Sequence, residues 1–234
     1  MPLPNNYLSN AEEHKAIQQL TSSNNGVCAT VSCPDARFAR LVNGKIAEIP
    51  DSRGVLDIKN RDPIRYSITG AAVAAKDKLQ NVIVLILESP HIDEFSGKVI
   101  APAMGKTGEH CFRYFDKLFA KSCLGSHISK NKQYDLVFVN SVQYQTSCGA
   151  SPLTDKTNKQ RRDNNWMTIF NGGASDDLLK RLYALNPVLV LNLCTKSTMN
   201  LQTAVDAKVR PKYYQKYTTG DHPFNWFKPS AKIM

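Results

Sequence analysis

Three short apolar runs are the clearest pattern along the chain. They are VIVLIL at 82–87, DLVFVN at 135–140 and VLVLNL at 188–193. Apolar runs of this length are typical of strands that are buried on both faces, as in a parallel sheet covered by helices. The pattern therefore predicts an α/β protein with a central, mostly parallel sheet.

Between these runs, apolar residues recur at helical spacing. The segment 175–185 has a stripe of four leucines, and the segment 108–121 has an apolar face made by Phe112, Phe115, Leu118 and Phe119. We expect Ser175 to cap the helix at 175–185, and we expect Asn186 and Pro187 to end it.

The region before the first apolar run is less regular. Residues 37–49 (RFARLVNGKIAEI) predict a β-hairpin that turns at Asn43-Gly44, whereas residues 63–80 predict a helix. The polar segment 154–165 shows no pattern that assigns it to an element.

Composition is that of one ordinary globular domain. The chain has 234 residues, of which 42% are apolar and 21% are charged. We expect residues 1–62 to form an N-terminal extension packed on the same domain, and residues 63–234 to form its main part. The apolar runs are too short to span a bilayer, and the N-terminus lacks the features of a signal peptide, so a cytoplasmic protein without a membrane partner is expected.

The net charge of the chain indicates what kind of partner the protein binds. Thirty Lys and Arg against twenty Asp and Glu give a formal net charge of +10. Such a balance favours a polyanionic partner, with nucleic acid first and an anionic membrane surface second.

The six cysteines show no regular framework. Cys28 and Cys33 are five residues apart, which is wider than the two-residue gap of a typical metal knuckle. We therefore expect free thiols and no metal.

The stretch LESPHIDEFSGKVIAPAMGKTG at 87–108 carries the most distinctive chemistry. Its Gly105-Lys106-Thr107 triplet resembles the end of a phosphate-binding loop. However, Ile100 stands where that loop needs a glycine, and the preceding strand ends far upstream, so no nucleotide cofactor is expected.

A different set of motifs is more informative because of its order. Leu87-Glu88-Ser89-Pro90-His91 is followed by Glu94 and by a turn at 102–108, then by Asn140 after the second apolar run, and finally by His222-Pro223. In this order the motifs resemble those of the uracil-DNA glycosylase superfamily, especially its thermophile-type branch. The resemblance implies a three-layer α/β/α sandwich around a mostly parallel four-stranded sheet.

The resemblance also implies roles for individual residues. Glu88 would orient the attacking water or stabilise the sugar cation, and His222 would donate to the departing base. Contacts with the flipped base would come from Asn140, His91, Ser89, Glu94, Ala103 and Met104. Trp226 would wedge into the DNA, and further DNA contacts would come from Phe227, Asn225, Lys106, Lys196, Ser197, Arg161 and Arg162.

Read singly, these residues have simpler explanations. A carboxylate at a strand end is often a cap or a surface group, and Trp226 with Phe227 could belong to a core. The basic residues at 156–162 could be a solvated loop.

The chain departs from the family in its cysteines and in its base pocket. Four cysteines hold an iron–sulfur cluster in the thermophile-type branch, but here no clear set exists; we expect no cluster, and Cys28, Cys33, Cys111 and Cys148 are the nearest set. Ser89 stands where the most efficient uracil-specific branch has an aspartate, and Phe224 replaces the serine that usually follows His-Pro. Ala103 replaces the ring that stacks on uracil, and His91 replaces a tyrosine that excludes groups at carbon 5.

We therefore expect a monofunctional DNA glycosylase that acts as a monomer on DNA. The favoured substrate is a bulky modified pyrimidine, such as the glucosylated hydroxymethylcytosine of phage DNA, and the setting would be bacterial defence against phage. Two alternatives stay open, which are a repair enzyme that excises uracil and a non-catalytic nucleic-acid-binding module on the same scaffold.

Overall fold

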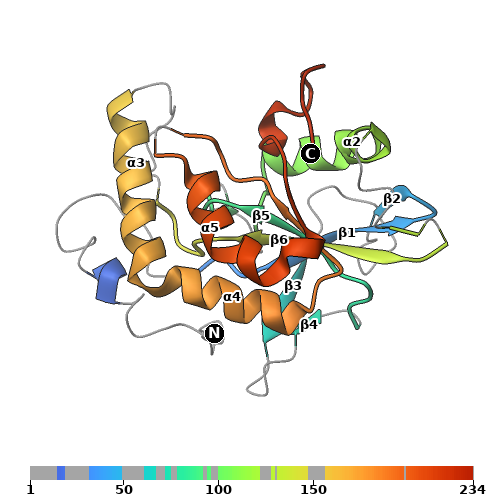
Figure 1. Cartoon of the computed structure of the whole chain (residues 1–234), viewed down its shortest axis with the longest axis horizontal. Coiled ribbons are helices and arrows are strands. Elements are labelled where there is room, and N and C mark those ends of the chain that lie inside the picture. The colour runs from blue at the N-terminus through green and yellow to red at the C-terminus, as the bar shows by residue number, and fades with distance from the viewer. Residues whose placement is uncertain are drawn as a thin grey trace.

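The computed structural model of the chain describes residues 15–18, 32–48, 61–66, 72–74, 78–91, 94–95, 100–121, 128–129, 131–146, 156–197 and 199–233. Within these ranges, eight strands form one sheet (Figure 1). The strands are β1 (Ala36–Val42), β2 (Lys45–Glu48), β3 (Asp62–Tyr66), β4 (Ala72–Ala74), β5 (Ile83–Leu87), β6 (Tyr134–Asn140), β7 (Leu189–Asn192) and β8 (Tyr217–Thr219).

The sheet has a parallel half and an antiparallel half. Seven strands lie in the order β4-β3-β1-β6-β5-β7-β8, and β2 pairs with β1. Strands β6, β5, β7 and β8 run parallel to one another. Strand β1 is antiparallel to β6, β2 and β3, and β3 is antiparallel to β4. The sheet is therefore mixed and larger than the four parallel strands expected from the sequence.

The three apolar runs are confirmed as strands. Every residue of β5, β6 and β7 is buried. Because these strands are parallel, their carboxyl ends meet at one edge of the sheet, which is where ligands bind in open α/β sheets.

The predicted hairpin is confirmed, but the predicted helix at 63–80 is wrong. Asn43 (φ 53°) and Gly44 (φ 75°) both take left-handed backbone angles, as the tight turn between β1 and β2 requires. Residues 62–66 and 72–74 form β3 and β4. In β3, Ile64 and Tyr66 are buried while Arg65 is exposed, which is the alternation of a strand.

Four helices complete this part of the chain. They are α2 (Lys106–Lys121), α3 (Lys156–Ile169), α4 (Ser175–Leu185) and α5 (Leu201–Tyr213). Helix α3 continues through a π-helical turn, η3 (Phe170–Ala174), into α4, so Ser175 does not cap that helix; Ala174 precedes it without a side-chain cap. Asn186 (φ 43°) ends α4 as expected.

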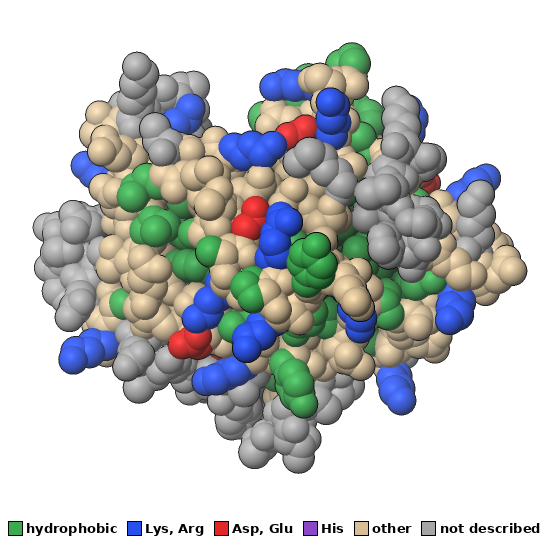
Figure 2. Space-filling view, viewed as in Figure 1, with side chains coloured by type: hydrophobic (Ala, Val, Ile, Leu, Met, Phe, Trp, Pro, Cys, Tyr) green, Lys and Arg blue, Asp and Glu red, His purple; other side chains and the backbone are tan. Residues whose placement is uncertain are grey.

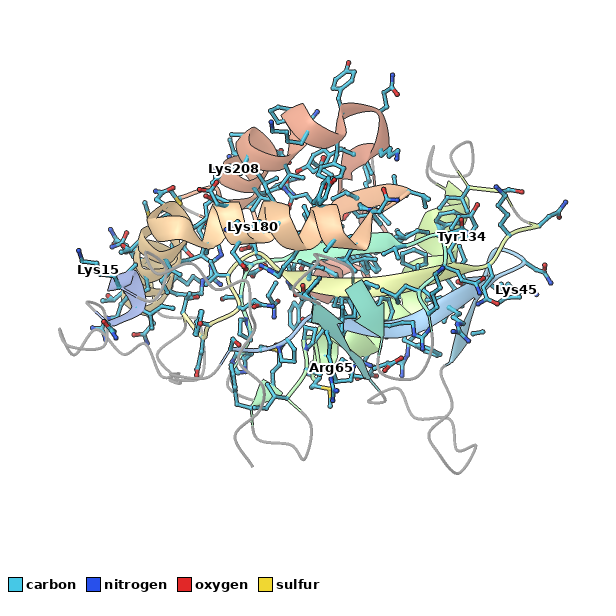
Figure 3. The ribbon with its side chains drawn as sticks, turned by 90° about the horizontal axis from the view of Figure 1, so that it is seen from below. Lys15, Lys45, Arg65, Tyr134, Lys180 and Lys208 are labelled. Carbon is cyan, nitrogen blue, oxygen red and sulfur yellow. The ribbon has the colours of Figure 1, made fainter. Side chains whose placement is uncertain are left out.

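Two hydrophobic clusters take alternate residues of the central strands. Val84 and Ile86 of β5 pack with residues of α3, α4 and α5, whereas Ile83, Leu85 and Leu87 pack with residues of α2 and with Trp226. Figure 3 shows α4 and α5 together on one side of the sheet, with Lys180 and Lys208 on them. In the same view, Lys45 and Tyr134 lie at the end of the strands away from the carboxyl edge.

None of the helices in the described ranges is long and apolar enough to cross a membrane.

Candidate active site

Glu88 is the first residue after β5, at the carboxyl edge of the sheet. Its backbone oxygen accepts three hydrogen bonds, from Ser141 Oγ (2.7 Å), Trp166 Nε1 (2.8 Å) and the Val142 N–H (3.0 Å). The residue is 8% exposed, and its Oε2 atom has no hydrogen-bond partner among the described residues. A carboxylate oxygen is therefore held in a fixed place and left available to a ligand.

His222 faces Glu88 from the loop that follows β8. Its Nε2 atom lies 3.5 Å from Glu88 Oε2. The N–H of Phe224 donates to His222 Nδ1 (3.3 Å), at the start of the short 3-10 helix η5 (Pro223–Asn225). Because Nδ1 accepts this bond, the proton of the neutral ring belongs on Nε2, which is the atom that faces Glu88.

The loop that carries His222 is tied to residues 231–233. Gly220 forms an antiparallel bridge with Ile233, and the Asp221 N–H donates to the Lys232 oxygen (2.9 Å). The Lys232 N–H in turn donates to the Asp221 carboxylate (2.9 Å). His222 therefore sits on a braced segment.

A cavity of about 630 Å³ lies in front of this pair. Its wall combines the loops after β5, β7 and β8, the start of α2 and one residue of α3. The lining residues are Leu87, Glu88, Ser89, Pro90, His91, Glu94, Gly105, Lys106, Thr107, Arg162, Thr195, His222, Phe224 and Asn225. Figure 2 shows a notch at the upper edge of the molecule, between the lobe with α3 and the lobe with α2 and the C-terminal segment, and Lys and Arg side chains lie on both lobes.

Glu94 is a second carboxyl group on this wall, with a different environment. Burial raises the pKa of Glu94 to about 8, although backbone N–H groups of Ala103 and His91 lower it and the charge of Glu88 raises it further. At neutral pH Glu94 is therefore protonated, and Glu88 is not opposed by a second negative charge beside it.

Asn140 ends β6 but does not lie on the cavity wall. It is 1% exposed, and its Nδ2 atom has no hydrogen-bond partner in the described part of the chain. The amide lies beside the thiol of Cys33, which in turn donates to Glu94 Oε2 (3.9 Å). Arg181 Nη2 holds the Asn140 backbone oxygen (3.0 Å). The residue is thus fixed behind Cys33 and Glu94, next to the cavity.

The predicted basic residues occupy different places. Arg162 and Lys106 line the cavity, and Arg161 is exposed on α3. Lys196 is exposed and lies 3.5 Å from the Asp221 carboxylate. The hydroxyl of Ser197 is buried without a hydrogen-bond partner in the part of the chain that the structure describes.

The predicted wedge is corrected. Trp226 is only 3% exposed, packs beside Phe115 of α2 and donates its indole N–H to the Asp221 oxygen (2.7 Å). Its neighbours Phe224 and Phe227 are exposed, at 47% and 51%. The ring of His110 contacts both of them. Among the aromatic residues of this segment, Phe224 and Phe227 are therefore exposed and Trp226 is not.

The predicted base contact of Ala103 is also corrected. Ala103 is 1% exposed, has a left-handed φ of 55° and belongs to the core. Arg61 Nη2 donates to its oxygen (2.7 Å), and a Cβ on Gly108 would lie 2.0 Å from the same oxygen. Gly108 is required for this close turn. Neither Ala103 nor the half-buried Met104 lines the cavity, so the small side chain of Ala103 does not enlarge it.

The described cysteines lie apart from any cluster of ligands. Cys33 is beside Glu94, and Cys111 is buried in the α2 core. Burial raises the pKa of both thiols. Across the described ranges, no group of three or more His, Cys, Asp or Glu residues could hold a metal ion. Cys28 and Cys148 lie outside these ranges.

Sequence reasoning did not assign several wall residues to the site, and two of them, Thr195 and Phe224, have side chains suited to contact a ligand. Thr195 is the third residue after β7, and its hydroxyl is buried without a hydrogen-bond partner among the described residues. A polar residue just past an apolar run is a signal that could have identified it. Phe224 departs from the family pattern in sequence, and the structure places it on the cavity wall.

Comparison with known proteins assigns no relative, because no protein-family model, curated protein or solved structure matches the chain.

Proposed function

We propose that the chain is a monofunctional DNA glycosylase, which flips a base out of DNA, hydrolyses its N-glycosidic bond and leaves an abasic site. The observation that carries this proposal is the Glu88–His222 pair, held on a cavity at the carboxyl edge of parallel strands. The three-layer arrangement of the glycosylase superfamily is part of the same proposal. Helices that pack with both faces of the central strands support it.

The two side chains match the two charges that form during the reaction. As the bond breaks, positive charge develops on the sugar and negative charge on the base. Glu88, with a free carboxylate oxygen, stabilises the cation and orients a water molecule. His222 donates from Nε2 to a carbonyl of the departing base. The water adds to the sugar carbon, and the base leaves with the bonding electrons and takes up a proton.

Charge and aromatic exposure support DNA as the substrate. Lys106 lines the cavity and Arg161 lies exposed beside it on α3, in a chain of formal charge +10, which suits a phosphate backbone. Phe227 is the exposed ring that would fill the gap left by the flipped base.

Cavity size supports a bulky modified pyrimidine as the base, with glucosylated hydroxymethylcytosine of phage DNA as the favoured example. A bare pyrimidine has about eight non-hydrogen atoms and needs on the order of 200 Å³, if each takes the space of about one water molecule. The cavity of about 630 Å³ leaves room for the sugar and for a substituent. In the uracil-specific branch, a tyrosine at this position excludes substituents at carbon 5 of the base. Here the position holds His91, which is exposed on the cavity wall.

One observation favours uracil instead. Phe224 lines the cavity and could supply the stacking ring that Ala103 does not. Repair of uracil is therefore the second candidate function.

The decisive experiment compares base release from duplexes that contain uracil, hydroxymethylcytosine or glucosylated hydroxymethylcytosine, detected by alkaline cleavage at abasic sites. We expect Glu88→Gln and His222→Ala each to lower the single-turnover rate by about 10²- to 10⁴-fold, because each acts on charge that appears in the transition state. Glu109→Gln, at a half-exposed carboxylate paired with Arg113 on α2, is the matched control.

Each alternative gives a distinct result. Release of uracil alone would replace the modified base as substrate. DNA binding without release of any base would leave the non-catalytic module.

A further inference from the structure

Arg162 enters the cavity from a helix whose position relative to Glu88 is fixed. It lies one turn before Trp166 on the same face of α3, and the indole of Trp166 donates to the Glu88 oxygen (2.8 Å). Trp166 is fully buried and stacks on Phe170. The Arg162 side chain is therefore held on the same cavity as the Glu88 carboxylate.

Asp163 orients the guanidinium of Arg162 but accepts hydrogen bonds from only two of its three nitrogen atoms. Asp163 Oδ1 accepts from both Nε (2.8 Å) and Nη2 (2.6 Å), and the Asp163 side chain is fully buried. The Nη1 group has no hydrogen bond to any described residue, and Arg162 is only 9% exposed. Because a nearly buried guanidinium needs acceptors for its N–H groups, Nη1 is suited to hold a ligand.

Arg162, paired with Asp163, is unlike an arginine that binds phosphate. Asp163 cancels the charge of Arg162 at contact distance, so an anionic ligand gains little attraction there. Its neighbour Arg161 is exposed and suits phosphate contacts better. A neutral group that supplies acceptor oxygens fits Arg162.

A second polar group on the wall fits the same kind of ligand. The Thr195 hydroxyl is buried without a hydrogen-bond partner in the described ranges, and it can both donate and accept. A donor-only guanidinium and an unused hydroxyl on one wall are complementary to hydroxyl groups, which also donate and accept.

We propose that Arg162 and Thr195 form a subsite for a neutral, polyhydroxylated substituent on the flipped base. The inference deepens the proposed glycosylase function and rests on it for the identity of the base. Arg162 is a specificity residue in this view, because it contacts the substituent and not the bond that breaks.

Calorimetric titration with two nucleosides tests the subsite without relying on catalysis. The probes are 5-hydroxymethyl-2′-deoxycytidine and the same nucleoside with glucose on the hydroxymethyl oxygen. We expect the protein to bind the glucosylated nucleoside about 10- to 100-fold more tightly, as hydrogen bonds to a charged donor allow. The double variant Arg162→Met, Asp163→Asn should abolish this preference without leaving an unpaired buried carboxylate.

Two further variants sharpen the result. Thr195→Val should reduce the preference by a few fold, and Arg113→Met, which removes an exposed arginine on α2, should leave it unchanged. Equal affinity for the two nucleosides, or a preference that survives in the double variant, would overturn the subsite.

Base release from DNA separates this inference from the proposed function. A double variant that loses release of the glucosylated base but keeps release of hydroxymethylcytosine or uracil supports the subsite. Absence of release from every DNA by the unaltered protein would sink the glycosylase proposal, while the nucleoside titration would still decide the subsite.

Discussion

At the scale of single residues, the site separates two carboxyl groups by their surroundings. Glu88 has a free oxygen that faces His222, whereas Glu94 is enclosed and has a pKa of about 8. Sequence motifs pointed to both residues, but no sequence pattern shows that the pKa of the Glu94 carboxyl is raised. The same limit applies to Trp226, since an aromatic residue after His-Pro reads equally well as exposed or as core.

Glu94→Gln should change how stability depends on pH. The folded-state pKa of about 8 is above the ordinary value of 4.5, so the stabilisation from Glu94 is complete below about pH 4.5 and is lost as pH rises through 8. Glutamine stays neutral, so the variant should lack this loss. Denaturant unfolding at pH 5, 6.5 and 8 should show the difference, up to about 1.4 kcal/mol per pH unit. Parallel stability curves for the two proteins would contradict the assignment.

Trp226→Ala and Phe227→Ala should have opposite phenotypes. Trp226 is part of the core, so its loss should cost about 3–5 kcal/mol in the free energy of unfolding. Phe227 is 51% exposed, so its loss should leave stability nearly unchanged but weaken base release from duplex more than from single-stranded DNA. A stable Trp226→Ala variant with a duplex-specific defect would restore the wedge to Trp226.

At the scale of elements, the strands and helices that were predicted correctly are those with a regular local pattern of apolar residues. Apolar runs in the sequence identified strands β5, β6 and β7, and apolar residues at helical spacing identified helices α2 and α4. Helix α3 was not, because its residues 156–165 are polar on all sides and its buried anchor, Trp166, comes only afterwards. Strand β3 was mistaken for a helix because its register against β1, which no local pattern reveals, decides its conformation.

Trp166→Phe tests how α3 supports Glu88 at the carboxyl edge of the sheet. The change keeps an aromatic ring in the core but removes the hydrogen bond to the Glu88 oxygen, which should cost about 1 kcal/mol of stability. Base release should fall several fold, since the backbone of Glu88 loses one of its three donors. Tyr134→Phe is the matched control. It removes a hydrogen bond between an aromatic side chain and the backbone, donated by the Ser129 N–H, at the far end of the sheet, and it should leave activity unchanged.

At the scale of the whole molecule, the site could be predicted only in outline. The order of motifs brought Glu88, His222 and several wall residues to one cavity, because parallel strands deliver their carboxyl ends to the same edge. The position of Asn140 behind Cys33, and the approach of Arg162 from α3, depend on how distant elements pack and could not be read from spacing.

The proposed affinity for DNA should depend on salt, because the chain has a formal net charge of +10. We expect Arg161→Ala to reduce the slope of log affinity against log salt by about 0.9, which corresponds to one lost phosphate contact. Lys45→Ala removes the same charge at the end of the sheet away from the carboxyl edge, and should leave the slope unchanged (Figure 3). Fluorescence anisotropy with a labelled duplex at several salt concentrations measures the slope for each variant. An equal change in the slopes of the two variants would show that binding is not localised at the cavity.

The pairing of β1 with β6 has a consequence for the speed of folding. Arg37 pairs with Val137, so the middle of the sheet joins segments that the chain separates by β2, β3, β4, β5 and α2. Closing so large a loop costs entropy before any contact compensates for it, and domains dominated by such distant pairings fold in milliseconds to seconds. During synthesis, β1 emerges long before β6, and of its three neighbours in the sheet only β2 and β3 are available to it first. The edge of β1 that β6 later covers is then open to other chains, so we expect the newly made protein to be prone to aggregation until β6 and the carboxyl edge of the sheet are in place.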